Sequence, residues 1–127
     1  MRDHRKLEAF SLADDLALQT YLATTEFPAK EQFGLTAQMR RAAVSVPTNI
    51  VEGCARRTEA DFLRFLDIAY GSAKELEYEV SLATRLGYFE KDHGRTLTVA
   101  CGRVASILNA LINSFGRNRA HSKPGKL

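Results

Sequence analysis

The chain has 127 residues, of which 45% are hydrophobic, so it is long enough to bury the core of one domain without metals or disulfides. Its 18 basic and 15 acidic residues leave a net charge of +3, which indicates nucleic acid only where the charge is clustered. The charged N-terminus carries no apolar signal segment, and no run approaches the roughly 18 apolar residues of a membrane span. We therefore expect neither secretion nor contact with a membrane.

Cys54 and Cys101 are the only cysteines of the chain. Both lie inside helical patterns, and Cys101 falls on an apolar stripe. This placement favours two buried free thiols over a disulfide. The prediction fits a reducing, cytoplasmic location.

The first half of the chain predicts two helices. Residues 1–6 are mostly charged, and we predict a flexible basic N-terminus there. Apolar residues then recur with helical spacing from residue 7 to about residue 24. Pro28 suits the first position of a second helix, which we extend to about Arg57, because the missing N–H of proline would be unpaired there anyway.

The second predicted helix, residues 28–57, has two faces and a proline. The apolar face comprises Leu35, Met39, Ala42, Val46 and Ile50. The polar face comprises Arg41, Ser45, Thr48 and Glu52. Pro47 removes a backbone donor inside this pattern and should cost about 3 kcal/mol unless a kink absorbs the clash. We predict one kinked helix, with Ser45, Thr48, Asn49 or a water bonded to the freed carbonyl of Ala43.

Two longer helices follow. Thr58 caps a helix over residues 59–86, with Asp61 three residues later and Gly87 at its C-terminal end. Its apolar positions alternate four and three apart, as in a helical bundle. A second row of apolar residues with this spacing, or apolar seam, predicts a fourth helix that ends at Gly116. We predict a disordered basic tail over 117–127. Gly71 and Ser72 predict a close helix crossing, because glycine inside a helix otherwise costs stability.

Four amphipathic helices with short connections predict an all-α fold. We expect an antiparallel up-and-down four-helix bundle over residues 7–116 with a proline-kinked second helix, because short loops make sequential helices run in opposite directions.

The sequence shows no catalytic constellation. Glu90 and His93 have the Glu-x-x-His spacing of di-iron bundles, but that chemistry needs a second such pair and further inward carboxylates. The other histidines, His4 and His121, lie far from it in the sequence. Because no Gly-rich phosphate loop follows a strand either, we expect neither an enzyme nor a bound metal or cofactor.

Charge is distributed unevenly between the middle helices. Residues 28–57 hold five basic and two acidic side chains, whereas residues 58–86 hold three basic and six acidic ones. The opposite charges can pair within one chain, or they can face another subunit or a polyanion. The sequence leaves both interpretations open.

Several segments together look familiar. They are Phe27-Pro28, Phe33-Gly34-Leu35, Gln38 to Gly53, Phe62-Leu63-Arg64-Phe65-Leu66, Ala69-Tyr70-Gly71-Ser72, Glu75-Leu76-Glu77 and Leu86-Gly87-Tyr88. Over roughly residues 7–115 the chain resembles the four-helix-bundle proteins encoded in intervening sequences of bacterial large-subunit ribosomal RNA genes. The resemblance implies a bacterial cytoplasmic protein that forms a ring-shaped homo-oligomer, a pentamer, of no established molecular role. More distantly, the chain is similar to the accessory variability proteins of diversity-generating retroelements, basic pentameric barrels that bind a reverse transcriptase and nucleic acid.

We therefore hypothesise a non-enzymatic, ring-forming bundle that associates with RNA, DNA or a nucleic-acid-processing protein; the alternative is a protein-interaction scaffold without nucleic-acid contact. The candidate nucleic-acid-binding residues are Arg40, Arg41, Arg56, Arg57, Arg117, Arg119, Lys123 and Lys126. The candidate structural or interface residues are Pro47, Asn49, Glu52, Gly53, Gly71, Ser72 and Glu75.

Overall fold

The computed structural model describes residues 2–122, with side chains described through residue 116. Its elements are η1 (His4–Lys6), α1 (Glu8–Ala23), η2 (Ala29–Glu31), α2 (Leu35–Cys54), α3 (Glu59–Arg85) and α4 (Lys91–Ser122). No strand occurs in this part of the chain, so the all-α prediction is confirmed.

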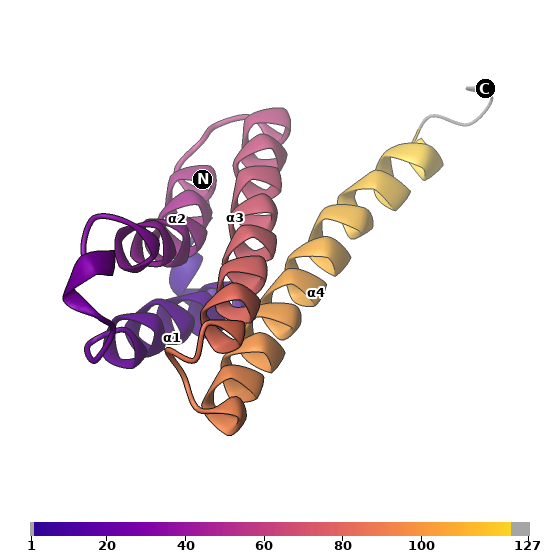
Figure 1. Ribbon diagram of the computed structural model, residues 1–127. Coiled ribbons are helices and arrows are strands. Elements are labelled where there is room, and N and C mark those ends of the chain that lie inside the picture. Colours follow the sequence, from indigo (N-terminus) through magenta and orange to yellow (C-terminus); the bar gives the residue numbers. More distant parts are fainter. Residues whose placement is uncertain (1, 123–127) are drawn as a thin grey trace.

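The four α-helices pack as a bundle. α2 packs on both α1 and α3, and α4 packs on both α3 and α1, so the helices form a closed circuit of neighbours. Figure 1 shows this arrangement, with the last turns of α4 pointing away from the other three helices. The four-helix bundle is confirmed, whereas the antiparallel order stays a prediction from the short connections.

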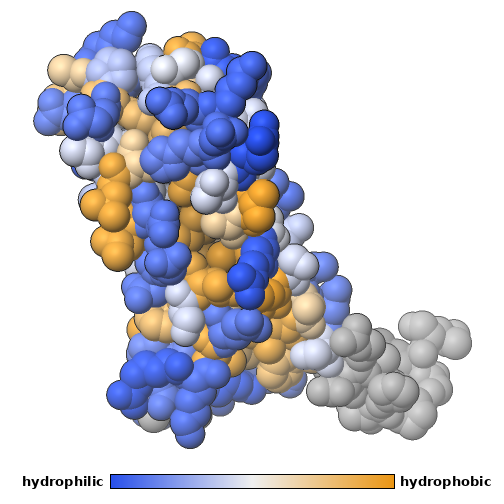
Figure 2. Space-filling model, turned by 90° about the horizontal axis from the view of Figure 1, so that it is seen from below, coloured by the Kyte–Doolittle hydropathy of each residue, from blue (hydrophilic) through white to orange (hydrophobic). Residues whose placement is uncertain are grey.

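The core is built from the apolar seams that the sequence predicts. Its largest fully buried residues are Leu16, Met39, Val46, Ile50, Phe62, Leu66, Leu76, Val80, Leu97, Val104 and Leu108. Cys54 and Cys101 are buried and free, as predicted, and burial raises the pKa of the Cys101 thiol to about 12. Outside this core, Figure 2 shows apolar patches interrupted by polar residues on one face of the molecule.

From the sequence we expect no segment that approaches a membrane span, but residues Lys91–Gly116 of α4 are long and apolar enough to cross a membrane by length and composition. In the bundle, however, Leu97, Cys101, Val104 and Leu108 of this helix are buried in the common core. Only 28% of the apolar window is buried, so packing against α1 and α3 explains part of its apolar character.

The start of α2 differs from the prediction. The residues after Pro28 form only the short turn η2, and α2 begins at Leu35. The Glu31 carboxylate accepts the N–H of Leu35 at 3.0 Å and the hydroxyl of Tyr88 at 2.8 Å. These bonds, the one to the Leu35 N–H first, lower the pKa of Glu31. A carboxylate from the preceding turn therefore caps α2, because Gly34 has no side chain that could do so.

The ends of α3 follow the prediction. The Thr58 hydroxyl accepts the N–H of Asp61 at 3.2 Å, and α3 begins at the next residue, Glu59. At the other end Gly87 has a φ of 80° and its N–H donates to the Thr84 carbonyl at 3.0 Å. This conformation suits a glycine that closes a helix.

Pro47 lies inside an uninterrupted α2, as predicted. Asn49, however, does not bond to the carbonyl of Ala43 that the proline frees. Its amide Nδ2 donates instead to the Ser45 carbonyl at 2.8 Å and to Ser45 Oγ at 2.9 Å. The kink of α2 stays a prediction.

Close helix approaches lie at other glycines than the one predicted, among them Gly53. An added Cβ on Gly53 would meet Phe65 Cβ at 3.0 Å and the Phe62 carbonyl at 3.2 Å, whereas one on Gly71 meets nothing within 4 Å. The close-crossing prediction is therefore wrong for Gly71. Its neighbour Ser72 does touch α2, through Ser45 Oγ at 2.8 Å.

Both ends of the chain are more regular than the sequence suggests. Residues 4–6 form η1, and the N–H of Arg2 donates to the Cys54 carbonyl at 2.8 Å, so the N-terminal segment is tied to the end of α2. α4 continues to Ser122, past Gly116 where we expect its end. Of the tail predicted to be disordered, 117–122 are helical, and 123–127 lie outside the described residues.

Candidate functional site

An open groove of about 960 Å³ runs along the outer face of α2 between α1 and α3. Its floor comes from α2 and includes the polar face that the sequence predicts, Arg41, Ser45, Thr48 and Glu52. Tyr21 of α1 and Ser72 and Glu75 of α3 form its walls. Small side chains on α2, such as Ala37 and Ser45, keep the floor low between the neighbouring helices.

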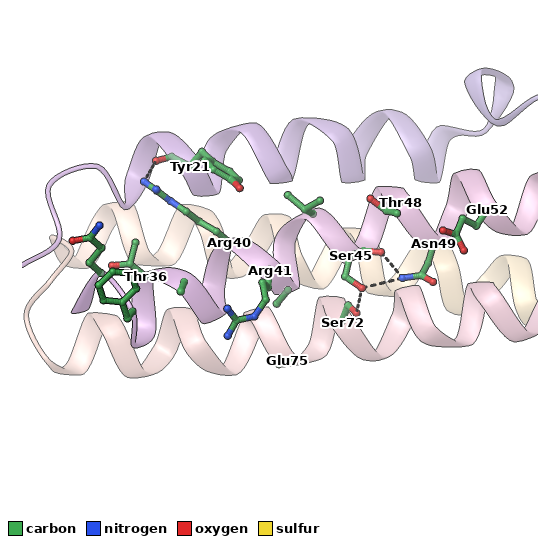
Figure 3. A pocket seen from close by; sticks show the side chains of 15 residues that line it. Tyr21, Thr36, Arg40, Arg41, Ser45, Thr48, Asn49, Glu52, Ser72 and Glu75 are labelled. Carbon is green, nitrogen blue, oxygen red and sulfur yellow. Dashed lines mark hydrogen bonds between the residues drawn. The ribbon is translucent and has the colours of Figure 1, made fainter. Parts of the chain in front are cut away.

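A hydrogen-bond network joins the floor to the α3 wall (Figure 3). Ser45 Oγ and Ser72 Oγ lie 2.8 Å apart, and Asn49 Nδ2 donates to Ser45 Oγ at 2.9 Å. The Ser45–Ser72 bond links α2 directly to α3, so the network helps to fix the spacing of the two helices. The sequence alone does not pair Ser45 with Ser72, because 27 residues separate them.

A buried carboxyl lies behind the groove. Glu79 of α3 is 4% exposed, and its Oε1 has no hydrogen-bond partner among the described residues. Burial first, and then the nearby Glu75 carboxyl, raise the pKa of Glu79 to about 7, while Arg41 opposes the shift. The sequence patterns do not predict that Glu79 is buried. The available signal is its position one residue before the core residue Val80 and four residues after Glu75.

The two adjacent arginines of α2 have different surroundings. Arg40 Nε donates to Thr24 Oγ1 at 2.9 Å, Nη2 donates to the Tyr21 carbonyl at 3.3 Å, and the guanidinium lies 4.7 Å from the Tyr21 ring centre. Arg40 therefore joins α2 to the C-terminal end of α1, where a cation is favourable. Arg41 is exposed, points toward α3 (Figure 3) and forms no ion pair with a described side chain.

A second candidate surface lies where α2 turns into α3. The guanidiniums of Arg56 and Arg64 lie 4.7 and 4.6 Å from the centre of the Phe65 ring. Arg2 lies over the ring of Phe62 at 4.0 Å. Together with the exposed Arg57, these arginines form a surface that we call the basic end, which comprises Arg2, Arg56, Arg57 and Arg64.

Acidic residues neutralise the basic end only in part. Glu52 lies 3.8 Å from Arg56, and Asp61 lies 3.8 Å from Arg64, with all four side chains about half exposed. Such pairs are weak in water. Arg2 and Arg57 form no ion pair within the described part of the chain.

α4 reaches the same end of the bundle, because Phe115 packs on Phe62 with ring centres 5.5 Å apart. The basic sequence 117–126 follows directly. Its Arg117, Arg119, Lys123 and Lys126 are predicted binding residues whose side chains lie outside the described ones.

The predicted site residues thus separate into groups. Asn49, Glu52, Ser72, Glu75, Arg40 and Arg41 line the groove, and Arg56 and Arg57 belong to the basic end. Gly53 and Pro47 are buried in the helix packing, and Gly71 is exposed without a contact that would need glycine. Among the described residues no group of three or more His, Cys, Asp or Glu side chains could hold a metal.

The fold and these surfaces define the class: a small all-helical bundle whose polar features are a groove and a basic end. The model of the 23S rRNA-intervening sequence protein family matches residues 5–110. The chain belongs to this family, as the resemblance in its sequence indicates.

A solved structure shows the same fold. It is a protein of unknown function from the S23 ribosomal protein family of Bacteroides thetaiotaomicron. The two sequences are 23% identical, and the match covers 83% of this chain and 95% of the other, with a TM-score of 0.76. No curated protein matches the chain.

Proposed function

We propose that this protein is a non-enzymatic homo-oligomer that binds nucleic acid, RNA in the first place, through the basic end of each bundle. The family to which the chain belongs is that of the 23S rRNA-intervening sequence protein. That description supports RNA as the first ligand to test, with DNA or a nucleic-acid-processing protein as further partners.

The observation that carries the proposal is the stacking of arginines on aromatic rings at the basic end. The rings of Phe65 and Phe62 pack against Arg56, Arg64 and Arg2, and all three arginines are exposed to solvent. A preorganised guanidinium loses less side-chain freedom when it contacts a phosphate. Such contacts supply most non-specific nucleic-acid binding.

Salt-dependent binding to a single-stranded RNA tests this function. Replacing Arg56 and Arg57 by alanine should weaken binding at least tenfold and reduce the slope of log K against log salt by about 1.4, since each phosphate contact contributes about 0.7. The control is Arg95→Ala, which removes an exposed arginine at the start of α4. Equal binding by the double variant and wild type, with the same slope, contradicts the proposal.

Self-association completes the proposed function. The resemblance implies a ring of five copies, which would bring five basic ends together and make binding to one RNA multivalent. Light scattering of dilute protein at moderate salt tests the assembly, and a stable monomer refutes it.

The second candidate function is a protein-interaction scaffold in the cytoplasm. The observation that favours it is the groove, where apolar side chains such as Phe33 accompany groups of both charges. A protein that self-associates but gives no salt-dependent retention on RNA would support the scaffold.

A further inference from the structure

An exposed apolar ridge runs along α1 beside the groove. Leu18, Tyr21 and Leu22 are 60%, 44% and 67% exposed, and their spacing places them on one face of α1. The opposite face of this helix, with Ala13 and Leu16, fills the core. The bundle therefore leaves Leu18 and Leu22 largely exposed. Together with Tyr21, which stacks with Arg40 and lines the groove, they form what we call the α1 ridge.

The groove next to the ridge is shaped to receive a helix. Its floor along α2 carries a row of short side chains, including Ala37, Val44 and Thr48 at helical spacing, beside the longer Arg41 and Glu52. Phe33, which lines the same groove, is 88% exposed. Small residues on one helix allow another to approach closely, and grooves of this kind accept amphipathic helices.

Arg40 fixes the relation between ridge and groove. It bonds to Thr24 and Tyr21 of α1 from its place on α2, and its guanidinium covers one face of the Tyr21 ring (Figure 3). These contacts tie the end of the ridge at Tyr21 to the groove floor in the single chain. An arrangement formed before binding lowers the entropic cost of docking.

Charge identifies a suitable occupant. Asp14 and Asp15 lie one turn before Leu18 on exposed positions of α1 and form no ion pair with a described residue. Arg41 in the groove likewise forms no ion pair with a described side chain, although it lies near the buried Glu79 carboxyl. An α1 helix that lies in the groove of another molecule can bring these acidic residues to Arg41.

We propose that the α1 ridge of one copy docks in the α1–α2–α3 groove of a second copy, with Asp14 and Asp15 beside Arg41. This inference rests on the self-association in the proposed function and names the surface that performs it. Because Leu18 and Leu22 lie outside the groove lining, the contact joins two unlike surfaces and is head-to-tail. Such a contact closes into a ring when the rotation per copy divides the circle.

Subunit number, measured by light scattering and sedimentation, tests this surface. Leu18→Ser with Leu22→Ser should weaken self-association at least tenfold, because both side chains are exposed in the single chain and buried in the contact. Val99→Ser is the matched control, since Val99 on α4 is 65% exposed and lies outside both surfaces. Helical circular dichroism and thermal melting report whether each variant is folded.

Charge exchange adds a test that does not depend on apolar burial. Arg41→Glu should also weaken association at least tenfold, and Asp14→Arg with Asp15→Arg in the same chain should restore it. Folded variants that assemble like wild type in both tests overturn the proposed surface, while the proposed self-association stands. A monomeric wild-type protein overturns the self-association itself and this surface with it.

Discussion

The Glu79 carboxyl is buried on α3 in contact with Glu75, with Arg41 as the nearby cation. Its pKa of about 7 lies above the usual 4.5, mainly because burial disfavours the charged form. Between these two values the folded chain binds more protons than the unfolded chain. The free energy of unfolding therefore falls as pH rises from about 4.5 to about 7.

Glu79→Gln should remove this pH dependence. Glutamine keeps the shape of the side chain and carries no charge, so the variant should gain stability relative to wild type at pH 8 and much less at pH 5. Urea denaturation at the two pH values measures the difference. Asp67→Asn, at an exposed position of the same helix, is the control. An equal effect of Glu79→Gln at both pH values would show that Glu79 does not titrate in this range.

Gly53 and Gly71 offer a matched comparison on two helices. Gly53→Ala should destabilise the protein by about 1–3 kcal/mol, because the new Cβ presses on Phe65 and the Phe62 carbonyl. Gly71→Ala should stabilise it by up to about 1 kcal/mol, because this exposed helical site has room for a methyl group. Urea denaturation distinguishes the signs, and a stabilised Gly53→Ala variant would refute the close contact.

At the scale of the elements, α3 and the seam of α4 follow from the sequence because their apolar residues keep one spacing and their caps are local. Local patterns do not reveal that Glu31 and Tyr88, 57 residues apart, meet where α2 starts. The polar floor of the groove, by contrast, can be predicted from the sequence of α2 alone. The walls of the groove and the burial of Glu79 depend on which helices pack together. The apolar spacing within one helix does not specify this packing.

The cost of Pro47 can be measured in α2. Pro47→Ala restores a backbone N–H and removes the ring clash, worth about 3 kcal/mol in a helix interior. It also deletes two buried methylene groups at about 0.8 kcal/mol each. We expect a net stabilisation of about 1 kcal/mol in thermal or urea unfolding. A clear loss of stability would mean that the packing of the proline ring outweighs the helix term.

For the whole molecule, the net charge of +3 is a poor guide, because the arrangement of charge matters more. The structure gathers Arg2, Arg56, Arg57 and Arg64 at one end and places the apolar α1 ridge and the groove along the side of the bundle. In our proposal the side surfaces hold copies together, and the ends meet RNA. Assembly would then multiply a weak basic surface into a multivalent one.

Native mass spectrometry of the protein purified from its host at low salt tests this account most directly, because it counts protein copies and bound nucleic acid in the same particle. The account predicts a closed homo-oligomer, of five copies by the family resemblance, that carries RNA and releases it at high salt without losing subunits. A monomer free of nucleic acid would contradict it.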